Sequence, residues 1–157
     1  MSEEVYLTPD GAEDLRRELN LLLTVKRPEL ARKLKEAVAE GDLKENADYH
    51  DAKEQQAFIE GRIQYVENIL RAAILIVNDG STDEVRIGSE VTIREDGGDE
   101  DETYMIVGAA EANPAEGKIS QKSPIGQALL GRKKGDKVKV QTPSGTVTFK
   151  VKKIGSD

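Results

Sequence analysis

The 157-residue sequence predicts an α+β protein with an N-terminal antiparallel coiled-coil hairpin and a small C-terminal antiparallel β domain with one short helix. Three observations predict this fold. Apolar residues recur at helical spacing through residues 10–78, short strand-like runs fill the rest of the chain, and charged residues make up 34% against 4% aromatic residues. We therefore expect an arm at residues 1–78 and a second domain at residues 79–157.

Helical spacing is clearest in the second half of the arm. Apolar residues recur there at alternating intervals of four and three, which is the heptad pattern of a coiled coil. The seam consists of Ala52, Gln56, Ile59, Ile63, Val66, Leu70 and Ala73. Its polar member, Gln56, is either a register device or a tolerated defect.

The first half of the arm carries a looser seam that is interrupted near Pro28. Proline lacks a backbone donor, so we expect a kink or a register shift there. The seam residues are Ala12, Leu15, Leu19 and Leu22 before the proline and Leu30, Leu34 and Ala37 after it. Because both halves bury an apolar stripe, we expect a hairpin with its turn at residues 41–46. About 30 residues per helix give an arm of about 45 Å.

The C-terminal domain shows strand-like runs separated by Gly, Pro and Asp clusters. The predicted strands are Glu90–Arg94, Thr103–Val107, Lys137–Gln141 and Thr146–Val151. PIGQALLG at residues 124–131 begins at a proline and ends at a glycine, which predicts a short helix. The turn-rich segment NDGSTDE at residues 78–84 is the expected linker.

Charge is segregated along this domain. Residues 79–116 hold 2 basic and 12 acidic residues, whereas residues 117–157 hold 10 basic and 2 acidic residues. The stretch EDGGDEDE at residues 95–102 is interpreted as a solvated hairpin loop; a calcium loop is the alternative, although the spacing of an EF-hand is absent. The basic stretch is either a docking face for an acidic partner or a solvated sheet edge.

Composition excludes several classes of function. The absence of cysteine excludes disulfides, thiol catalysis and cysteine-ligated metal. A net charge of −7 argues against a free-standing nucleic-acid-binding protein. The longest apolar run, AAILIV at residues 72–77, is too short to span a membrane, and the acidic N-terminus does not resemble a signal peptide. These features predict a soluble cytoplasmic protein.

The expected turn, within GDLKENADYH at residues 41–50, contains two acids at the spacing of a capping box. Asp42 and Glu45 either cap the second helix or, if Asn46 is the N-cap, project into solvent and are free to bind a ligand. Spacing alone favours capping. In the other interpretation the carboxylates help to hold Mg²⁺ whose remaining ligands come from a partner, and the metal activates water for attack on a phosphodiester.

Other polar residues near the turn allow an ordinary and a functional interpretation. His50 is the only histidine, so neither a metal site nor a catalytic triad is expected of it. Tyr49 either packs at the end of the seam or stacks on a base. The lysines near the turn either steer a phosphate backbone or belong to a solvated helix face; they are Lys33, Lys35, Lys44 and Lys53.

Several motifs resemble one known family along essentially the whole chain. GDLKENADYHDAKEQQ at residues 41–56, with KRPEL upstream and EGRI just after, closely resembles the bacterial Gre transcript cleavage factors, nearer to the GreA type than to the GreB type. SPIGQALLGRKKGD at residues 123–136 and QTPSGTVTFKV at residues 141–151 are similar to the C-terminal domain of that family.

The resemblance implies a coiled-coil arm and a C-terminal domain similar to FK506-binding proteins, without prolyl isomerase activity. It implies a factor that docks on bacterial RNA polymerase through the C-terminal domain and inserts the arm into the secondary channel. There it would stimulate the polymerase's own cleavage of the backtracked RNA 3′ end, so the factor itself would not be an enzyme. Ser123, Pro124 and Ile125 are expected at the polymerase-docking surface.

The resemblance also implies roles at the turn. Asp42 and Glu45 match the tip carboxylates of the family, which implies that they share Mg²⁺ with the polymerase active site and reverses the preference for capping. Lys44, Lys53 and Tyr49 are expected to contact RNA.

One departure from the family concerns the basic patch along the arm. Val38 and Glu40 stand where basic residues are common in the family, which favours cleavage of short backtracked RNA over grip on long RNA. Two alternatives remain: a non-cleaving regulator in the same channel, and a coiled-coil adaptor unrelated to transcription. An intact acidic pair favours cleavage over the first alternative.

Overall fold

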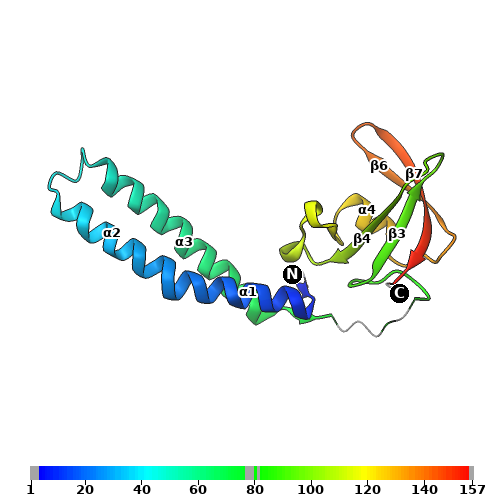
Figure 1. Ribbon diagram of the computed structural model, residues 1–157, viewed down its shortest axis with the longest axis horizontal. Helices are drawn as coiled ribbons and strands as arrows, with labels where there is room; N and C mark the ends of the chain where they lie inside the picture. Colours follow the sequence, from blue (N-terminus) through cyan, green and yellow to red (C-terminus); the bar gives the residue numbers. More distant parts are fainter. Residues whose placement is uncertain (1–3, 77–79, 81, 156–157) are drawn as a thin grey trace. The chain divides into compact units, whose positions relative to one another are not determined.

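The computed structural model describes residues 4–76, 80 and 82–155. They form two compact units (Figure 1). One unit is residues 12–72, and the other combines the described residues up to Gly11 with those from Ala73 onward. The first residues of the chain therefore group with the C-terminal part, whereas the sequence placed a single boundary after residue 78. Of the expected linker, residues 78, 79 and 81 lie outside the described residues.

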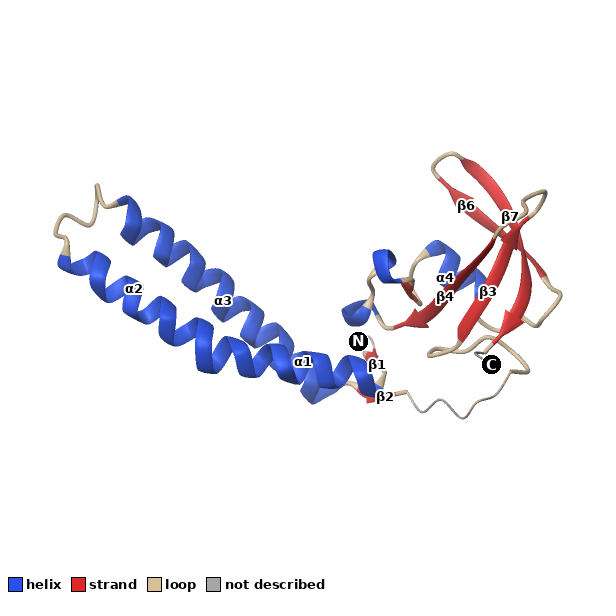
Figure 2. Ribbon diagram, in the orientation of Figure 1, coloured by secondary structure: helices blue, strands red, loops and turns tan. Residues whose placement is uncertain are grey.

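The arm is the predicted antiparallel hairpin (Figure 2). Its first half contains α1 (Pro9–Leu21), a π-helical segment (Leu22–Lys26) and α2 (Arg27–Ala39), and its second half is α3 (Ala47–Ala72). The most deeply buried seam residues come from both halves: Ala12, Leu15, Leu22, Leu30, Ala37, Ala52, Ile63 and Val66. The heptad interpretation of the sequence is confirmed, because the stripe that it identified is the stripe that the arm buries.

The π-helical segment explains the interruption of the first seam. The backbone N–H of Arg27 donates to the carbonyl of Leu22, five residues earlier, which is the hydrogen bond of a π turn. Leu22 and Leu30 are eight positions apart, one more than a heptad, and the wide turn absorbs the extra residue. Pro28 follows directly, in the first turn of α2, where its missing N–H is tolerated. The predicted register shift is confirmed.

Two ion pairs connect the halves of the arm. Arg27 donates to Glu60 at 2.6 Å, and Arg62 donates to Glu18 at 2.7 Å, each with both carboxylate oxygens engaged. The hydrogen bonds from Arg62 hold the pKa of Glu18 below its usual value. Because these pairs are about one-third to one-half exposed, each is expected to contribute about 1 kcal/mol or less.

The C-terminal unit is built on a five-stranded sheet with the order β5-β4-β3-β7-β6. The strands are β3 (Glu90–Glu95), β4 (Asp101–Val107), β5 (Lys118–Ser120), β6 (Lys137–Thr142) and β7 (Gly145–Ile154). All four predicted strands are confirmed. The short strand β5 was not predicted, and it pairs parallel to β4 while all other neighbours are antiparallel.

One face of this sheet and the short helix α4 (Pro124–Leu129) enclose the core. The buried cluster consists of Val85, Val91, Ile93, Ile106, Ile119, Leu129, Val138, Val140, Val151 and Ile154. Helix α4 begins as predicted, with Pro124 in the first turn and the Ser123 hydroxyl accepting from the N–H of Gly126. It ends before Gly131, whose φ of 79° is the left-handed conformation common at helix ends.

A two-residue strand near the start of the chain completes this unit. β1 (Tyr6–Leu7) pairs parallel with β2 (Ile74–Leu75), and Leu7 is fully buried. The next residue, Thr8, caps α1, since its hydroxyl accepts from the N–H of Gly11 at 3.0 Å. Its own N–H donates to a carboxylate oxygen of Glu111 at 3.0 Å, and its hydroxyl donates to the other oxygen. Glu111 ends the short 3₁₀ turn η2 (Ala109–Glu111).

Two further expectations concern the acidic loop and membranes. β3 ends at Glu95 and β4 begins at Asp101, so the acidic stretch is the predicted hairpin loop. Across the described part of the chain, no group of three or more acidic, His or Cys side chains could hold a metal, and the calcium alternative gains no support. No helix among these residues has the length and apolarity needed to cross a membrane.

Candidate functional site

The turn at the end of the arm begins where α2 stops at Ala39. Gly41 has a φ of 113°, a conformation that side chains with a Cβ atom rarely adopt. This glycine lets the chain leave α2 and enter the exposed turn, as the sequence break suggested. The turn then runs to Asn46, and α3 begins at Ala47.

Asn46 is the N-cap of α3. Its Oδ1 accepts from the backbone N–H of Tyr49 at 3.0 Å, and its Nδ2 donates to the carbonyl of Ala37 at 2.6 Å. The capping-box interpretation of Asp42 and Glu45 is therefore wrong, because both lie outside α3. Asn46 wins the competition since its side chain satisfies groups at the ends of both helices, which neither acid does.

The two acids of the turn are both exposed. Asp42 accepts a hydrogen bond from the backbone N–H of Lys44 at 3.1 Å, which orients one carboxylate oxygen in a local Asx turn. Within the described chain, no hydrogen bond or ion pair engages the carboxylate of Glu45. The turn thus presents one oriented carboxylate and one free carboxylate, three residues apart in sequence.

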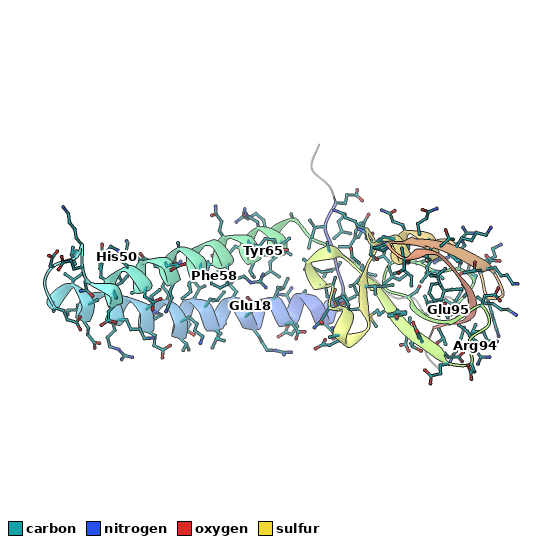
Figure 3. All side chains as sticks on the ribbon, turned by 90° about the horizontal axis from the view of Figure 1, so that it is seen from above. Glu18, His50, Phe58, Tyr65, Arg94 and Glu95 are labelled. Carbon is teal, nitrogen blue, oxygen red and sulfur yellow. The ribbon has the colours of Figure 1, made fainter. Side chains whose placement is uncertain are left out.

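His50 supports the turn, a role that the sequence reasoning missed. Its Nε2 lies 3.2 Å from the carbonyl oxygen of Lys44, and with a proton on Nε2 the ring donates to this oxygen. The ring also contacts Tyr49 edge-on, with centroids 5.6 Å apart. Figure 3 shows His50 near the end of the arm. The available signal was a lone histidine one turn after the N-cap, within reach of the preceding loop.

The residues expected to contact RNA are placed near the turn but differ in freedom. Lys44 is exposed, whereas Lys53 donates from Nζ to the side chain of Gln56 at 3.1 Å. Tyr49 is half-buried beside His50, so its ring is partly occupied by packing. Val38 and Glu40 are exposed on the last turns of the first half of the arm, as the departure from the family pattern required.

A groove of about 270 Å³ lies beside the turn, between α2 and α3. Four acids and one lysine supply its charge: Glu36, Glu40, Asp48, Asp51 and Lys33. This acidic lining repels phosphate groups, so an RNA strand is expected to avoid this side of the arm.

The chemistry available at the turn is that of an incomplete metal site. Mg²⁺ is commonly held by one or two carboxylates, with water and substrate phosphates supplying the other ligands. Asp42 and Glu45 fit this requirement in number and ligand type. Since the described residues offer no third metal-binding group, the pair can complete a site but cannot form one alone.

Two family models match the two parts of the chain. The model described as "Transcription elongation factor, N-terminal" matches residues 5–74, and "Transcription elongation factor, GreA/GreB, C-term" matches residues 80–156. The chain belongs to the GreA/GreB family. The resemblance inferred from its motifs is confirmed.

Individual GreA/GreB relatives match along nearly their whole length. Transcription elongation factor GreA of Roseiflexus castenholzii is 51% identical over 150 residues, covering 95% of this chain and 96% of that protein. Transcription elongation factor GreA of Bacillus subtilis is 47% identical over 153 residues, covering 97% and 98%. A crystal structure of GreA factor homolog 1 from Thermus thermophilus aligns over 98% of this chain and 100% of that chain, with 33% identity and a TM-score of 0.45.

In this GreA/GreB family member, the three residues expected to dock on polymerase lie together at the start of α4. Pro124 is exposed, whereas Ile125 is half-buried and packs against the sheet core. The Ser123 hydroxyl is occupied, since it also donates to the carbonyl of Ser120 at 2.7 Å. Only Pro124 is therefore free for a partner without a change in local packing.

Proposed function

We propose that the protein stimulates RNA polymerase to cleave backtracked RNA, by carrying Asp42 and Glu45 through the secondary channel to the polymerase active site. The observation that carries the proposal is the capping of α3 by Asn46, which leaves both carboxylates exposed at the end of a long arm. Membership of a transcription elongation factor family supplies the context in which such an arm acts.

Each residue of the turn has a separate task in this proposal. Asp42, oriented by the N–H of Lys44, and Glu45, which is free to rotate, would hold Mg²⁺ together with polymerase residues. A bound Mg²⁺ lowers the pKa of a coordinated water and supplies a nucleophile near a phosphodiester. His50 keeps the carbonyl of Lys44 in place and so supports the conformation in which Asp42 is oriented.

The remaining contacts fit the same proposal. Lys44 and Lys53 are placed to meet phosphates of the RNA 3′ end, and Tyr49 to contact a base. The acidic groove beside the turn disfavours a long RNA path along the arm, which agrees with cleavage of short backtracked segments. The start of α4, with Pro124 exposed, would contact the polymerase. The protein itself would supply ligands and no complete active site, so it would not act as an enzyme alone.

The test uses a stalled, backtracked polymerase complex. Asp42→Asn keeps the acceptor for the N–H of Lys44 but removes the charge, and Glu45→Gln removes a charge that no described residue pairs with. Each is expected to slow stimulated cleavage about tenfold or more, equivalent to about 1.4 kcal/mol of transition-state stabilisation. Thermal stability and polymerase binding should stay unchanged. Excess Mg²⁺ should restore part of the rate, because mass action offsets weaker ligands.

Glu40→Gln is the matched control, because Glu40 is an exposed acid just outside the turn. It should cleave as the wild type does. Wild-type rates from Asp42→Asn and Glu45→Gln would overturn the shared-metal role. Polymerase binding without any increase in cleavage by the wild-type protein would support the non-cleaving regulator instead. RNA hydrolysis by the protein without polymerase would show that the site is not shared.

A further inference from the structure

The outward face of β6 and β7 is rich in lysine. Along β6 the side chains alternate, with Lys137 and Lys139 exposed and Val138 and Val140 buried. The register of β7 places exposed Lys150 directly opposite Lys137. The buried face of these strands is core, so the three ammonium groups belong to the solvent face of the sheet.

This arrangement sets like charges directly opposite each other. Lys137 and Lys150 are cross-strand partners, and such like-charge pairs destabilise a sheet. On its other side, Lys150 is opposite Arg94, whose charge is neutralised by Asp101 at 2.7 Å. Figure 3 shows Arg94 on this unit. Within the described chain, no carboxylate pairs with Lys137, Lys139 or Lys150, so their charge is uncompensated.

The neighbouring sequence extends the positive charge. Residues 132–153 contain eight basic residues and one acidic residue, which gives a net charge of +7 (8 − 1). The exposed residues Lys133 and Lys134 lie in the turn before β6. The single acid, Asp136, accepts from the backbone N–H of Lys133 at 2.8 Å and is occupied within that turn.

Protection of a sheet edge explains only part of this pattern. β6 is an edge strand, and lysines on an edge discourage pairing with another chain. Lys137 and Lys139 fit that explanation. Lys150 does not, because β7 lies between β3 and β6 and has no free edge along this register. A negatively charged partner above the sheet accounts for all three lysines.

The chemistry of the face favours one kind of partner. Stable protein interfaces are depleted in lysine and enriched in aromatic residues and arginine, which argues against an acidic protein. Single-stranded nucleic acid is bound by stacking on aromatic rings, yet Phe149 is opposite Val138 and belongs to the core face. Lysine beside threonine, as in the pair Lys139 and Thr148, is suited to phosphate oxygens of a duplex.

We propose that this face, defined by Lys137, Lys139 and Lys150, binds the phosphate backbone of duplex DNA without sequence preference. The choice of DNA rests on the proposed function, since the template duplex accompanies an elongating polymerase. Lys137 and Lys139 are about 7 Å apart along β6, and Lys150 is about 5 Å away across the strands. Phosphates of one DNA strand recur every 3.4 Å or so along the helix axis, so this span can meet about three phosphates.

The test measures binding of the whole protein, without polymerase, to a fluorescent DNA duplex over a range of salt concentrations. Binding is expected to be weak and to need low salt, because the net charge of −7 repels DNA. The triple variant Lys137→Gln, Lys139→Gln, Lys150→Gln should weaken binding about tenfold or more at low salt. It should also reduce the slope of log K against log salt by about 2.7, which is about 0.9 for each lost phosphate contact.

A control variant removes the same charge from the arm: Arg16→Gln, Arg17→Gln, Lys26→Gln. It should keep the wild-type slope, and the sheet variant should melt no earlier than the wild type, because it relieves a like-charge pair. Equal slopes for the two variants would overturn the proposal. Tighter binding of single-stranded DNA, of duplex RNA or of polyglutamate would overturn the assignment to duplex DNA. Transcript cleavage is assayed separately, so DNA binding without stimulated cleavage would contradict only the proposed function.

Discussion

The side-chain amide of Asn46 donates to the carbonyl oxygen of Ala37 at 2.6 Å, across the turn from the last residues of α2 to the first of α3. The amide oxygen of the same side chain accepts from Tyr49. One residue therefore fixes both ends of the turn that carries Asp42 and Glu45. A carboxamide is required for this, because it is a donor and an acceptor at once.

Asn46→Asp should separate these two contacts. Aspartate caps a helix as well as asparagine does, so α3 should keep its helix content. The ionised carboxylate cannot donate to Ala37, so the turn loses its link to α2. We expect slower stimulated cleavage with unchanged polymerase binding, measured in the backtracked complex and by circular dichroism. Asn46→Ala removes both contacts and should also lower stability by about 1 kcal/mol. Wild-type cleavage by Asn46→Asp would show that the turn does not need the link.

The π-helical segment should tolerate the loss of one residue if the proline is also removed. Deleting Thr24 restores the heptad interval between Leu22 and Leu30, and it places Pro28 inside a regular helix, at a cost of about 3 kcal/mol. We therefore expect the deletion alone to lower the melting temperature of the arm. Adding Pro28→Ala should restore it, as measured by circular dichroism.

A deletion within α2 is the matched control for the Thr24 deletion. Removing Lys35 turns the part of α2 beyond it by about 100°, which takes Ala37 out of the seam. Pro28→Ala should not rescue this variant. If both deletions behave alike, the π turn is not the place where the extra residue is absorbed.

The ion pair between Glu18 and Arg62 should make arm stability depend on pH. The pKa of Glu18 is lowered by the hydrogen bonds from Arg62, so its contribution is present above the unfolded value of 4.5 and is lost as pH falls through the folded value. Because the pair is about one-third exposed, Glu18→Gln should cost about 1 kcal/mol or less near neutral pH. The difference between variant and wild type should shrink in acid, measured by chemical denaturation. A difference independent of pH would assign the effect to packing.

Tyr104 should ionise later than the other tyrosines in an alkaline titration followed by ultraviolet absorbance. Its hydroxyl donates to Glu102 at 2.7 Å, and this hydrogen bond, with burial and the adjacent charge, raises its pKa to about 12. The contribution to stability is complete below 10.0 and is lost as pH rises through about 12. Tyr104→Phe should remove the late transition, and Glu102→Gln should move it down. A late transition that survives Tyr104→Phe would contradict the assignment.

Much of the fold could be predicted because its signals are local. The heptad seam, Gly41 and the proline at the start of α4 each act within a few residues, so the helices and the hairpin turn were found. The four longer strands alternate buried and exposed residues and were also found. β5 was missed because three residues are too few for a pattern and its partner is fixed by parallel pairing. β1 and β2 were missed because each has only two residues.

The site was predictable in its residues but not in its bonding. The spacing of Asp42 and Glu45 is also that of a capping box, and Asn46 offered a second cap. The choice depends on the contact from Asn46 to Ala37, nine residues earlier, which exists only once the two helices lie together. The contact of His50 with the carbonyl of Lys44 is equally a product of the folded turn.

The pairing of β1 with β2 has a consequence for the order of events on the ribosome. Tyr6 is synthesised early, but its partner Ile74 follows 68 residues later (74 − 6), and Glu111 follows Thr8 by 103 residues. The hairpin can close as soon as α3 has emerged, because its contacts lie within residues 12–72. The strand that precedes the hairpin has to wait for much of the sheet domain. A nascent chain halted between these points would hold a finished arm whose first strand still lacks its carboxylate anchor.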